Sequence, residues 1–285
     1  MILITGATGN VGAELARILK SRGVPFRAMV RSPEAAQKNE ALAGAELEAG
    51  DFNDPTTIAR AMAGIDRAFL LTPSSEQAEA QQTAFVDIAR REGVRHVVKL
   101  SQWAADPDSP VRFLRYHAAV EQALRASGLA YTFLRPNLFM QGLLAFRGSI
   151  VAEGKFYAAA GDAKISAVDV RDIAAVAAAV LTREGHEGRT YSITGPEALT
   201  HSQMATYLAE ALGRPVEFVD VSPDAMRQAL IGFGLPVWQA DGLIEDYAHY
   251  RRGEASAVAS GVQDVTGNPP RSFAEFARDY RPALS

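Results

Sequence analysis

The stretch "ILITGATGNVG" at residues 2–12 decides the fold. An apolar run at residues 2–4 predicts a buried strand, and apolar side chains after the stretch recur at helical spacing. Between strand and helix stand Gly6, Gly9 and Gly12. A glycine turn at this place can present backbone N–H groups at a helix N-terminus, where they and the helix dipole favour a phosphate group. The stretch therefore predicts either a phosphate-binding turn or only a tight bend.

The context of the turn favours the first interpretation. Its spacing is G-x-x-G-x-x-G rather than the commoner G-x-G-x-x-G, but it follows a strand, precedes a helix and lies in a βαβ unit. We expect Gly6 to permit the turn, Gly9 to let the backbone approach a pyrophosphate, and Gly12 to allow close packing of the helix. The predicted dinucleotide-binding residues of this turn are Gly6, Thr8, Gly9, Asn10 and Val11.

Strand-like and helix-like segments alternate through the first half of the chain. The predicted strands are residues 2–5, 26–30, 46–49, 67–71, 96–100 and 131–134. The predicted helices are residues 11–22, 33–42, a helix that starts at Pro55 with Asp54 as its cap, 77–93 and 113–127. This alternation predicts an α/β fold of the Rossmann type, a doubly wound parallel sheet with helices on both faces.

The alternation loosens after residue 136. "DVRDIAAVAAAVL" at residues 169–181 predicts a buried helix, and residues 189–193 predict a seventh strand that returns to the sheet. From residue 196 we expect two or three helices and an isolated strand in "VEFVDV". The predicted domains are a dinucleotide-binding Rossmann domain at residues 1–154, its sheet completed by residues 164–194, and a smaller C-terminal α/β lobe at residues 195–285.

Composition limits the classes of function. The 29 lysine and arginine residues face 33 aspartate and glutamate residues, a formal charge of −4, which argues against a nucleic-acid surface. The absence of cysteine excludes disulfides, thiolate catalysis and cysteine-ligated zinc, and the histidines are scattered singly, so no metal site is predicted. No signal peptide or membrane span is recognisable. We expect a cytoplasmic protein that binds small molecules; a homodimer stays open, because apolar helix faces could be core or interface.

Arg31 decides between the two nicotinamide dinucleotides. It ends the second predicted strand, where a carboxylate would bind the 2′-hydroxyl of NAD and an arginine would accommodate a 2′-phosphate. No acidic residue lies between Ala28 and Pro33, so we predict NADP(H) in preference to NAD(H), although Arg31 could be only an exposed loop residue. Ligands of open α/β sheets lie at the carboxyl ends of the strands. This rule predicts that Asp51 and Phe52 border the adenine of the cofactor. It also predicts that Leu71, Thr72 and Pro73 run beside the cofactor.

Segments along nearly the whole chain resemble the atypical short-chain dehydrogenase/reductases. They are "ITGATGNVG", "VRSPEAA", "GDFNDPTTIARAMAGID", "LSQWAA", "YTFLRPNLFMQ", "VDVRDIAAVAAAVL" and "YSITGPEALTHSQMATYLAEALGRPV". The nearest branch is the NmrA-like group, which includes NAD(P)H:quinone oxidoreductases and triphenylmethane reductases. The resemblance is specific for fold and cofactor and loose for substrate.

The chain departs from the Tyr-x-x-x-Lys pair of that superfamily. Tyr116 is followed four residues later by Val120, and no lysine stands between Lys99 and Lys155. The lysine of the isoflavone-reductase-like branch would fall at His117, so it is absent as well. These absences argue against oxidoreduction of ketones and alcohols and against sugar epimerisation. They leave hydride transfer to a strong electrophile open, because a quinone or cationic dye needs mainly orientation and a dry pocket.

The resemblance also suggests residues for the reacting centre. It implies Ser101 near the nicotinamide and Pro136 and Asn137 beside its carboxamide, although Ser101 could equally be a strand-end hydroxyl satisfied by the backbone. His117 could donate a proton to a substrate oxygen, or it could be a structural histidine linked to Glu121. The candidate acceptor-pocket residues, each of which could instead be ordinary core, are Trp103, Phe139, Met140, Phe233 and Trp238. "GFGLPVW" at residues 232–238 reads as a loop that could cover the pocket.

The sequence is therefore consistent with three functions. The first is an NADPH-dependent reductase of quinones or similar conjugated acceptors, with His117 and Ser101 as candidate catalytic residues. The second is a regulatory NAD(P) sensor of the NmrA type that binds a partner protein and has no activity. The third is a reductase or epimerase of another small metabolite.

Overall fold

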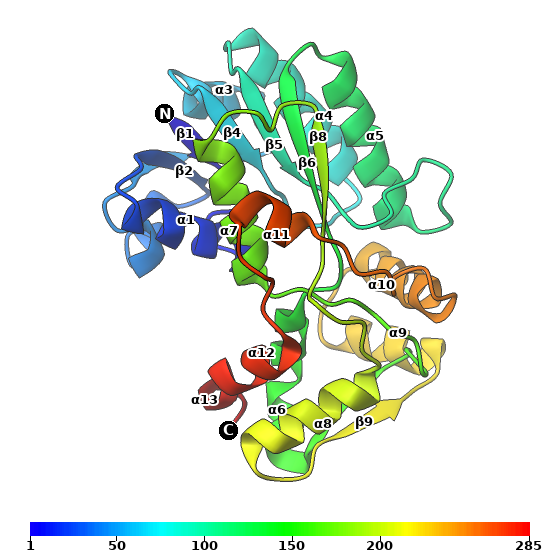
Figure 1. Ribbon diagram of the computed structural model, residues 1–285. Helices are drawn as coiled ribbons and strands as arrows, with labels where there is room; N and C mark the ends of the chain where they lie inside the picture. The colour runs from blue at the N-terminus through cyan, green and yellow to red at the C-terminus, as the bar shows by residue number, and fades with distance from the viewer. The chain divides into compact units, whose positions relative to one another are not determined.

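The computed structural model describes all residues 1–285, which form two compact units. The first unit comprises Met1–Pro107, Leu114–Arg135 and Val170–Tyr191, and the second comprises Asp108–Phe113, Pro136–Asp169 and Ser192–Ser285. The ribbon in Figure 1 follows the chain through both.

A seven-stranded sheet forms the centre of the first unit, in the order β3-β2-β1-β4-β5-β6-β8. Its strands are β1 (Ile2–Ile4), β2 (Phe26–Val30), β3 (Glu46–Ala49), β4 (Arg67–Leu70), β5 (His96–Leu100), β6 (Ala130–Pro136) and β8 (Arg189–Ile193). The pairings from β3 through β6 are all parallel. The strand order reverses between β1 and β4, and the crevice at such a reversal is where α/β sheets bind ligands. The predicted Rossmann-type sheet is confirmed.

Helices cover this sheet because its central strands β1, β4 and β5 are buried on both sides. The helical segments are α1 (Asn10–Ser21), α2 (Pro33–Ala36), η1 (Glu40–Leu42), α3 (Pro55–Met62), α4 (Ala78–Arg91), α5 (Arg112–Ala126) and α7 (Val170–Thr182). Alternate strand residues such as Leu3, Leu70 and Val97 share one core with side chains of α3, α4 and α5, among them Ile58 and Phe85. Helix α7 packs on β4 and β5 and against α1.

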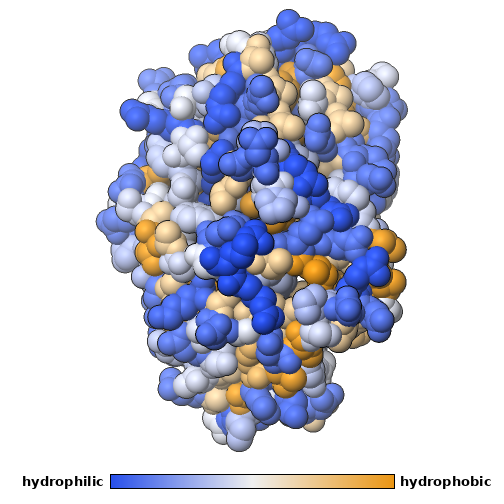
Figure 2. Space-filling model, turned by 90° about the vertical axis from the view of Figure 1, so that its right-hand side faces the viewer, coloured by the Kyte–Doolittle hydropathy of each residue, from blue (hydrophilic) through white to orange (hydrophobic).

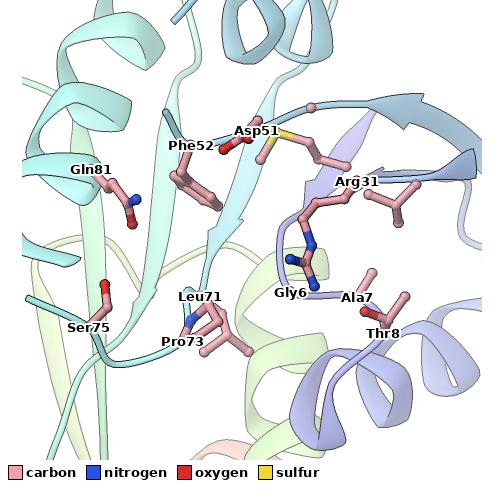
Figure 3. Close-up of a pocket in the computed structure, with 13 residues that line it drawn as sticks. Gly6, Ala7, Thr8, Arg31, Asp51, Phe52, Leu71, Pro73, Ser75 and Gln81 are labelled. Carbon is pink, nitrogen blue, oxygen red and sulfur yellow. The ribbon is translucent and has the colours of Figure 1, made fainter. Parts of the chain in front are cut away.

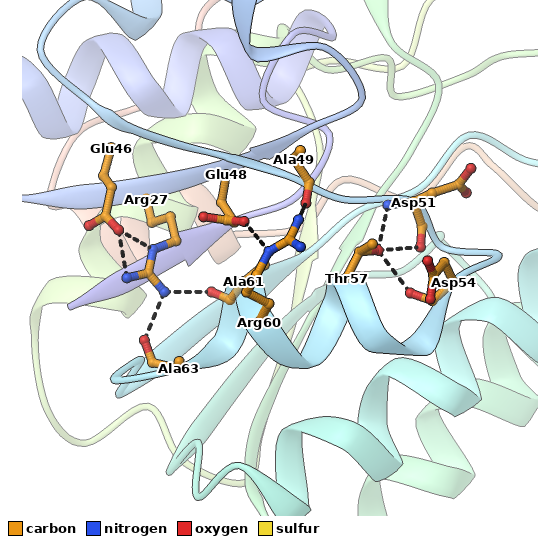
Figure 4. Close-up of polar contacts among 10 residues, drawn as sticks. All are labelled: Arg27, Glu46, Glu48, Ala49, Asp51, Asp54, Thr57, Arg60, Ala61 and Ala63. Carbon is orange, nitrogen blue, oxygen red and sulfur yellow. Dashed lines mark hydrogen bonds and ion pairs between the residues drawn. The ribbon is translucent and has the colours of Figure 1, made fainter.

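Ion pairs hold β3, the edge strand of this sheet (Figure 4). Arg27 of β2 pairs with Glu46 of β3 and donates to the carbonyl oxygens of Ala61 and Ala63 at the end of α3. Arg60 of α3 donates to the Ala49 carbonyl oxygen at 3.0 Å. These contacts fix the strand end that leads into residue 51.

The second unit has its own core and a two-stranded parallel sheet of β7 and β9. Its elements are η2 (Met140–Phe146), α6 (Arg147–Glu153), β7 (Lys155–Ala158), α8 (His201–Leu212), β9 (Glu217–Asp220), α9 (Pro223–Gly232), α10 (Val237–Arg251), α11 (Gly261–Thr266), α12 (Phe273–Asp279) and α13 (Arg281–Leu284). Thr200 and Gln203 form a capping box that starts α8. Phe156, Leu208 and Phe273 are fully buried in this core.

The structure corrects three predictions. The strand in "VEFVDV" is not isolated, because β9 pairs with β7, and six helices rather than two or three follow residue 196. Residues 136–169 lie in the second unit rather than in a domain at 1–154, because η2, α6 and β7 pack into the second core. The helix predicted at 33–42 is broken, since the Asn39 side chain accepts the Ala41 N–H at 3.0 Å and starts a separate 3₁₀ turn.

No helix has the length and apolarity that a membrane crossing requires. On the face shown in Figure 2, hydrophobic residues form separate patches among hydrophilic ones.

His201 makes the second unit sensitive to acid. Its ring is buried among Phe156, Phe218 and Tyr247, with centroid distances of 5.1–6.1 Å, and burial lowers its pKa from 6.5 to about 4. The unfolded chain therefore binds the extra proton between these two values, and stability is lost as the pH falls through this window. Going from about pH 7.5 to about pH 5 should lower the free energy of unfolding by about 2 kcal/mol through this residue.

Urea unfolding of wild type and His201→Phe at both pH values tests this expectation. The variant should lose less stability on acidification, and the remainder should reflect other buried histidines such as His96, whose pKa burial lowers to about 4, and His117, whose pKa it lowers well below 6.5. An acid loss of equal size in both proteins would contradict a neutral, buried His201.

Candidate active site

Two of the glycines in the turn between β1 and α1 are sterically required. Gly6 has φ +64°, and a Cβ there would lie 2.9 Å from the Leu71 side chain. A Cβ on Gly12 would lie 2.1 Å from the Gly6 carbonyl oxygen, so only glycine lets α1 start this close to the turn. A Cβ on Gly9 would be 3.4 Å from the same oxygen, an ordinary contact. Contacts within the protein therefore leave room for a side chain at position 9. The close approach of the Gly9 backbone to a pyrophosphate stays a prediction.

Thr5 joins the ends of the two central strands. Its hydroxyl lies 3.0 Å from the Phe69 carbonyl oxygen and 2.9 Å from that of Leu71, and it accepts the Leu71 N–H at 2.8 Å. Thr5 is fully buried. The turn after β1 and the loop after β4 are thus held together at the point where the strand order reverses.

The N-terminus of α1 fits a phosphate group. Gly9 is its N-cap residue, and no side chain caps the helix. The first intrahelical bond runs from the Ala13 N–H to the Gly9 carbonyl oxygen at 2.9 Å, so the N–H groups of Asn10, Val11 and Gly12 precede it. Such groups, together with the helix dipole, are the usual protein ligands of a pyrophosphate.

A pocket of about 340 Å³ opens beside this turn (Figure 3). Seven predicted cofactor residues line it: Gly6, Thr8, Arg31, Asp51, Phe52, Leu71 and Pro73. Gln81 and Ser75 line it as well and were not predicted. Polar residues such as these, in a helix turn and a loop, carry no sequence pattern that marks them as ligands.

Arg31 is the cation of this pocket. It is exposed and has no hydrogen bond or ion pair within the protein, whereas its neighbour Ser32 accepts the Ala35 N–H and so caps α2. Figure 3 shows the guanidinium reaching from the end of β2 toward Gly6 and Thr8. An unpaired guanidinium beside a phosphate-binding turn suits a further phosphate group.

The opposite wall of the pocket is held by local contacts. The Phe52 ring packs on Phe85 at a centroid distance of 5.9 Å. One oxygen of Asp51 accepts from the backbone and side-chain N–H groups of Asn53, at 2.8 and 3.0 Å, and Asn53 accepts from Gln81 at 2.9 Å. The wall thus offers an aromatic face and a carboxylate with one oxygen still available, a combination suited to a purine base.

The loop after β4 separates the pocket from a buried polar network. Leu71, Pro73 and Ser75 line the pocket, while the side chains between them bond elsewhere. Thr72 accepts from Gln82 of α4 at 2.7 Å, and the Ser74 hydroxyl lies 3.0 Å from the Tyr116 hydroxyl of α5. Thr72 was predicted to run beside the cofactor, but it does not line this pocket.

Lys99 is the centre of the network. It is fully buried in β5, and its Nζ lies 2.7 Å from Gln82 Oε1, 3.1 Å from the Leu100 carbonyl oxygen and 2.9 Å from His117 Nδ1. Lys99 was not among the predicted site residues, because the Tyr-x-x-x-Lys pattern places its lysine on the helix after β5. A lysine inside the apolar run "HVVKL" was the available signal, since a buried charge needs partners.

Glu121 holds a second set of contacts one turn along α5. Its buried carboxylate accepts from Ser101 at 2.6 Å, from Arg135 at 2.8 and 2.6 Å, and from Arg125 at 3.2 Å. The expected link from His117 to Glu121 is not present, because His117 bonds to Lys99 instead. Ser101 is thus tied to Glu121, and its predicted place beside a nicotinamide stays a prediction.

Burial changes the protonation of the Lys99–His117 pair. Desolvation lowers the pKa of Lys99 from 10.5 to about 7, despite the opposing charge of Glu121. Burial, reinforced by Lys99 and Arg135, lowers the pKa of His117 well below 6.5. His117 is therefore neutral at neutral pH.

The remaining predicted site residues are distributed between the units. Asn137 of the second unit uses its amide to donate to Ser166 and the Ala255 carbonyl oxygen and to accept the Leu138 N–H. Trp103 belongs to the first unit, and Phe139, Met140, Phe233 and Trp238 belong to the second. Met140 is buried in the second core, whereas Phe233 is 84% exposed. Pro136, the last residue of β6, is buried.

Comparisons with known proteins find relatives along the whole chain. The NAD(P)H azoreductase of Xenophilus azovorans is 39% identical over 284 residues, which cover 100% of this chain and 99% of the relative. A solved NADPH-dependent quinone oxidoreductase from Escherichia coli, complexed with NADPH, has a TM-score of 0.87 and 31% identity, covering 98% of this chain and 99% of that one. Citrobacter sp. triphenylmethane reductase complexed with NADP(H) has a TM-score of 0.86 and 29% identity, covering 99% and 100%. Residues 1–262 match the NmrA-like family, and the chain belongs to that family.

Proposed function

We propose that the chain is an NADPH-dependent reductase that transfers a hydride to a quinone or similar conjugated acceptor. The observation that carries the proposal is the pocket lined both by the unpaired Arg31 and by Gly6 and Thr8 of the turn that leads into the uncapped N-terminus of α1. The activities for which the relatives are named support the choice of acceptor, because azo compounds, quinones and triphenylmethane dyes are all conjugated electrophiles.

The residues of the first unit hold the cofactor in this proposal. The N–H groups at Asn10 and Val11 bind the pyrophosphate, Arg31 binds the 2′-phosphate, and Phe52 and Asp51 bind the adenine. Bound NADPH supplies the hydride. Leu71 and Pro73, which line the pocket, keep their predicted place along the cofactor, whereas the Thr72 side chain bonds to Gln82 instead.

Proton supply is the second requirement of the reaction. A quinone that accepts a hydride becomes a hydroquinone only after it also gains a proton. His117 is the proposed donor, because its Nε2 makes no hydrogen bond within the protein and the side chain keeps 8% of its surface exposed. Val120 stands where the Tyr-x-x-x-Lys pair would have its lysine, so the usual tyrosine mechanism is not proposed.

The remaining parts of the proposal are the acceptor side of the site, the partners and the cellular location. The places of Ser101, Pro136 and Asn137 near the nicotinamide stay predictions, as do the acceptor contacts of Trp103, Phe139, Met140, Phe233 and Trp238. Of the loop predicted at residues 232–238, Gly232 ends α9 and Val237 begins α10, so only residues 233–236, which include the exposed Phe233, connect the two helices, and their role as a cover stays a prediction. The proposed partners are small molecules rather than nucleic acid or a membrane, and the proposed location is the cytoplasm.

A turnover assay tests the function. The protein is mixed with NADPH and a panel of quinones, azo dyes and triphenylmethane dyes, and nicotinamide absorbance is followed. We expect turnover with at least one acceptor. His117→Ala should lower kcat far more than it lowers NADPH affinity, and His186→Ala, a substitution of an outlying histidine, should leave both unchanged. Tight NADPH binding without turnover of any acceptor would instead favour the regulatory sensor.

A further inference from the structure

We propose that Lys99 is the proton source of this site. Its ammonium group gives a proton to His117, and His117 in turn gives a proton to the acceptor. Lys99 is a positioning residue in this proposal, because its amine contacts the imidazole and not the acceptor. The inference rests on the proposed reductase function, but it concerns a contact that can be measured without any acceptor.

Each N–H group of the charged Lys99 amine has a hydrogen-bond acceptor. An ammonium group has three N–H donors, and three acceptors surround this one: Gln82 Oε1, the Leu100 carbonyl oxygen and His117 Nδ1. Nδ1 must therefore be unprotonated while Lys99 is charged. This fixes the neutral imidazole as the tautomer with its hydrogen on Nε2.

The same geometry also satisfies the uncharged pair. A neutral amine has two N–H donors for Gln82 and Leu100 and a lone pair that can accept from a protonated His117 Nδ1. One proton can thus pass from Nζ to Nδ1 over a 2.9 Å contact without leaving any of these atoms unpaired.

The relay balances in atoms and charge. The acceptor gains a hydride from NADPH and becomes an anion, and the Nε2–H bond of His117 breaks to give this anion its proton. At the same time a Lys99 N–H bond breaks and an Nδ1–H bond forms. The pair begins as ammonium with an Nε2–H imidazole and ends as neutral amine with an Nδ1–H imidazole, and solvent then restores the proton.

The network lies directly behind the wall of the cofactor pocket. Loop residues Thr72 and Ser74 bond to Gln82 and Tyr116, and these in turn contact Lys99 and the His117 ring. The Tyr116 and His117 rings are 4.2 Å apart between centroids. The Lys99–His117 pair is thus anchored to the same loop whose alternate residues line the pocket.

Neighbouring charges favour Lys99 rather than His117 as the protonated member of the pair. Glu121 of α5 is the anion that favours the charged amine, and Gln82 of α4 is neutral. Arg135 of β6 and Lys99 itself disfavour a charged His117. Burial brings the pKa of Lys99 to about 7, so the charged fraction of Lys99 falls as the pH rises through that value. Turnover should fall with it.

Lys99→Met tests the proposal through kinetics. The variant should bind NADPH like wild type, lose about 10- to 100-fold in kcat, and lose the decline of kcat above neutral pH. The control Lys155→Met replaces a half-exposed lysine of β7 and should keep the wild-type pH profile. A Lys99→Met protein with wild-type kcat and wild-type pH dependence would overturn the proposal.

Nitrogen NMR of the imidazoles in the ligand-free protein provides a readout that needs no turnover. Wild-type His117 should carry its hydrogen on Nε2 below pH 7 and should respond to a titration near pH 7. An Nδ1–H tautomer below that pH, or no response near it, would overturn the proposal even if the protein is an active reductase. Absence of turnover together with the expected NMR titration would refute the reductase function and leave the coupled pair established.

A further variant, Lys99→Cys, provides the test if the Lys99→Met protein folds poorly. The chain has no cysteine, so Lys99→Cys introduces a single thiol that can be aminoethylated in denaturant before refolding. This restores an amine of lower basicity in place of the lysine. The pH at which kcat declines should move downward, and an unchanged midpoint would overturn the proposal.

Discussion

Arg31→Ala should weaken NADPH binding by about 10- to 150-fold, because hydrogen bonds to a charged group contribute about 1.5–3 kcal/mol. NADH lacks the 2′-phosphate, so its affinity should change little. The expected result is therefore a loss of cofactor preference and not a general loss of binding. Titration of both cofactors against wild type and variant, followed by nicotinamide fluorescence, measures the four affinities.

The control for this experiment is Arg22→Ala. Arg22 is an exposed arginine at the end of α1, in the same unit, so it removes one positive charge without touching the pocket. The interpretation of Arg31 is wrong if wild type shows no NADPH preference, or if the preference survives in Arg31→Ala. An equal change in Arg22→Ala would mean that only the overall charge matters.

Glu121→Ala should have the largest effect on stability. The carboxylate is fully buried and accepts hydrogen bonds from Ser101, Arg125 and Arg135. Removing it leaves the guanidinium of Arg135, which is mostly buried, and the ammonium of Lys99 without their anion. Breaking a buried ion pair in this way costs about 3–5 kcal/mol. Urea unfolding with a constant m-value would measure the loss.

Glu14→Ala is the matched control for this loss. Glu14 is also on a helix and also pairs with an arginine, Arg17, three residues away, but the arginine is largely exposed. Exposed pairs contribute about 0–1 kcal/mol, so this variant should stay close to wild type. Similar losses in the two variants would show that the buried network around Glu121 is not a special source of stability.

The first unit was predictable because most of its strands are apolar runs bounded by turn residues. Residues 26–30, 46–49, 96–100 and 189–193 are strands with the predicted bounds, and Asp54 caps α3 as expected. The second unit was harder to predict, since β7 is four residues long and pairs with β9 about sixty residues later. Local sequence patterns contain no information on such a partner.

The cofactor side of the site was predictable for a similar reason. The carboxyl ends of β1, β2 and β4 meet at one place in any doubly wound sheet, so the positions of Gly6, Arg31 and Leu71 follow from strand order. The contact between Lys99 and His117 joins a strand to a helix, and its two residues are 18 positions apart. Spacing rules for one helix cannot reveal a lysine that arrives from a neighbouring strand.

The Thr5 hydroxyl has a thermodynamic consequence for cofactor binding. Because it ties the turn after β1 to the loop after β4, both walls of the pocket are set when the chain folds. The conformational entropy of these segments is lost at that stage and not on binding. Preorganisation of this kind leaves more of the interaction free energy for affinity. Loosening this tie would weaken NADPH and NADH alike, whereas Arg31 separates the two.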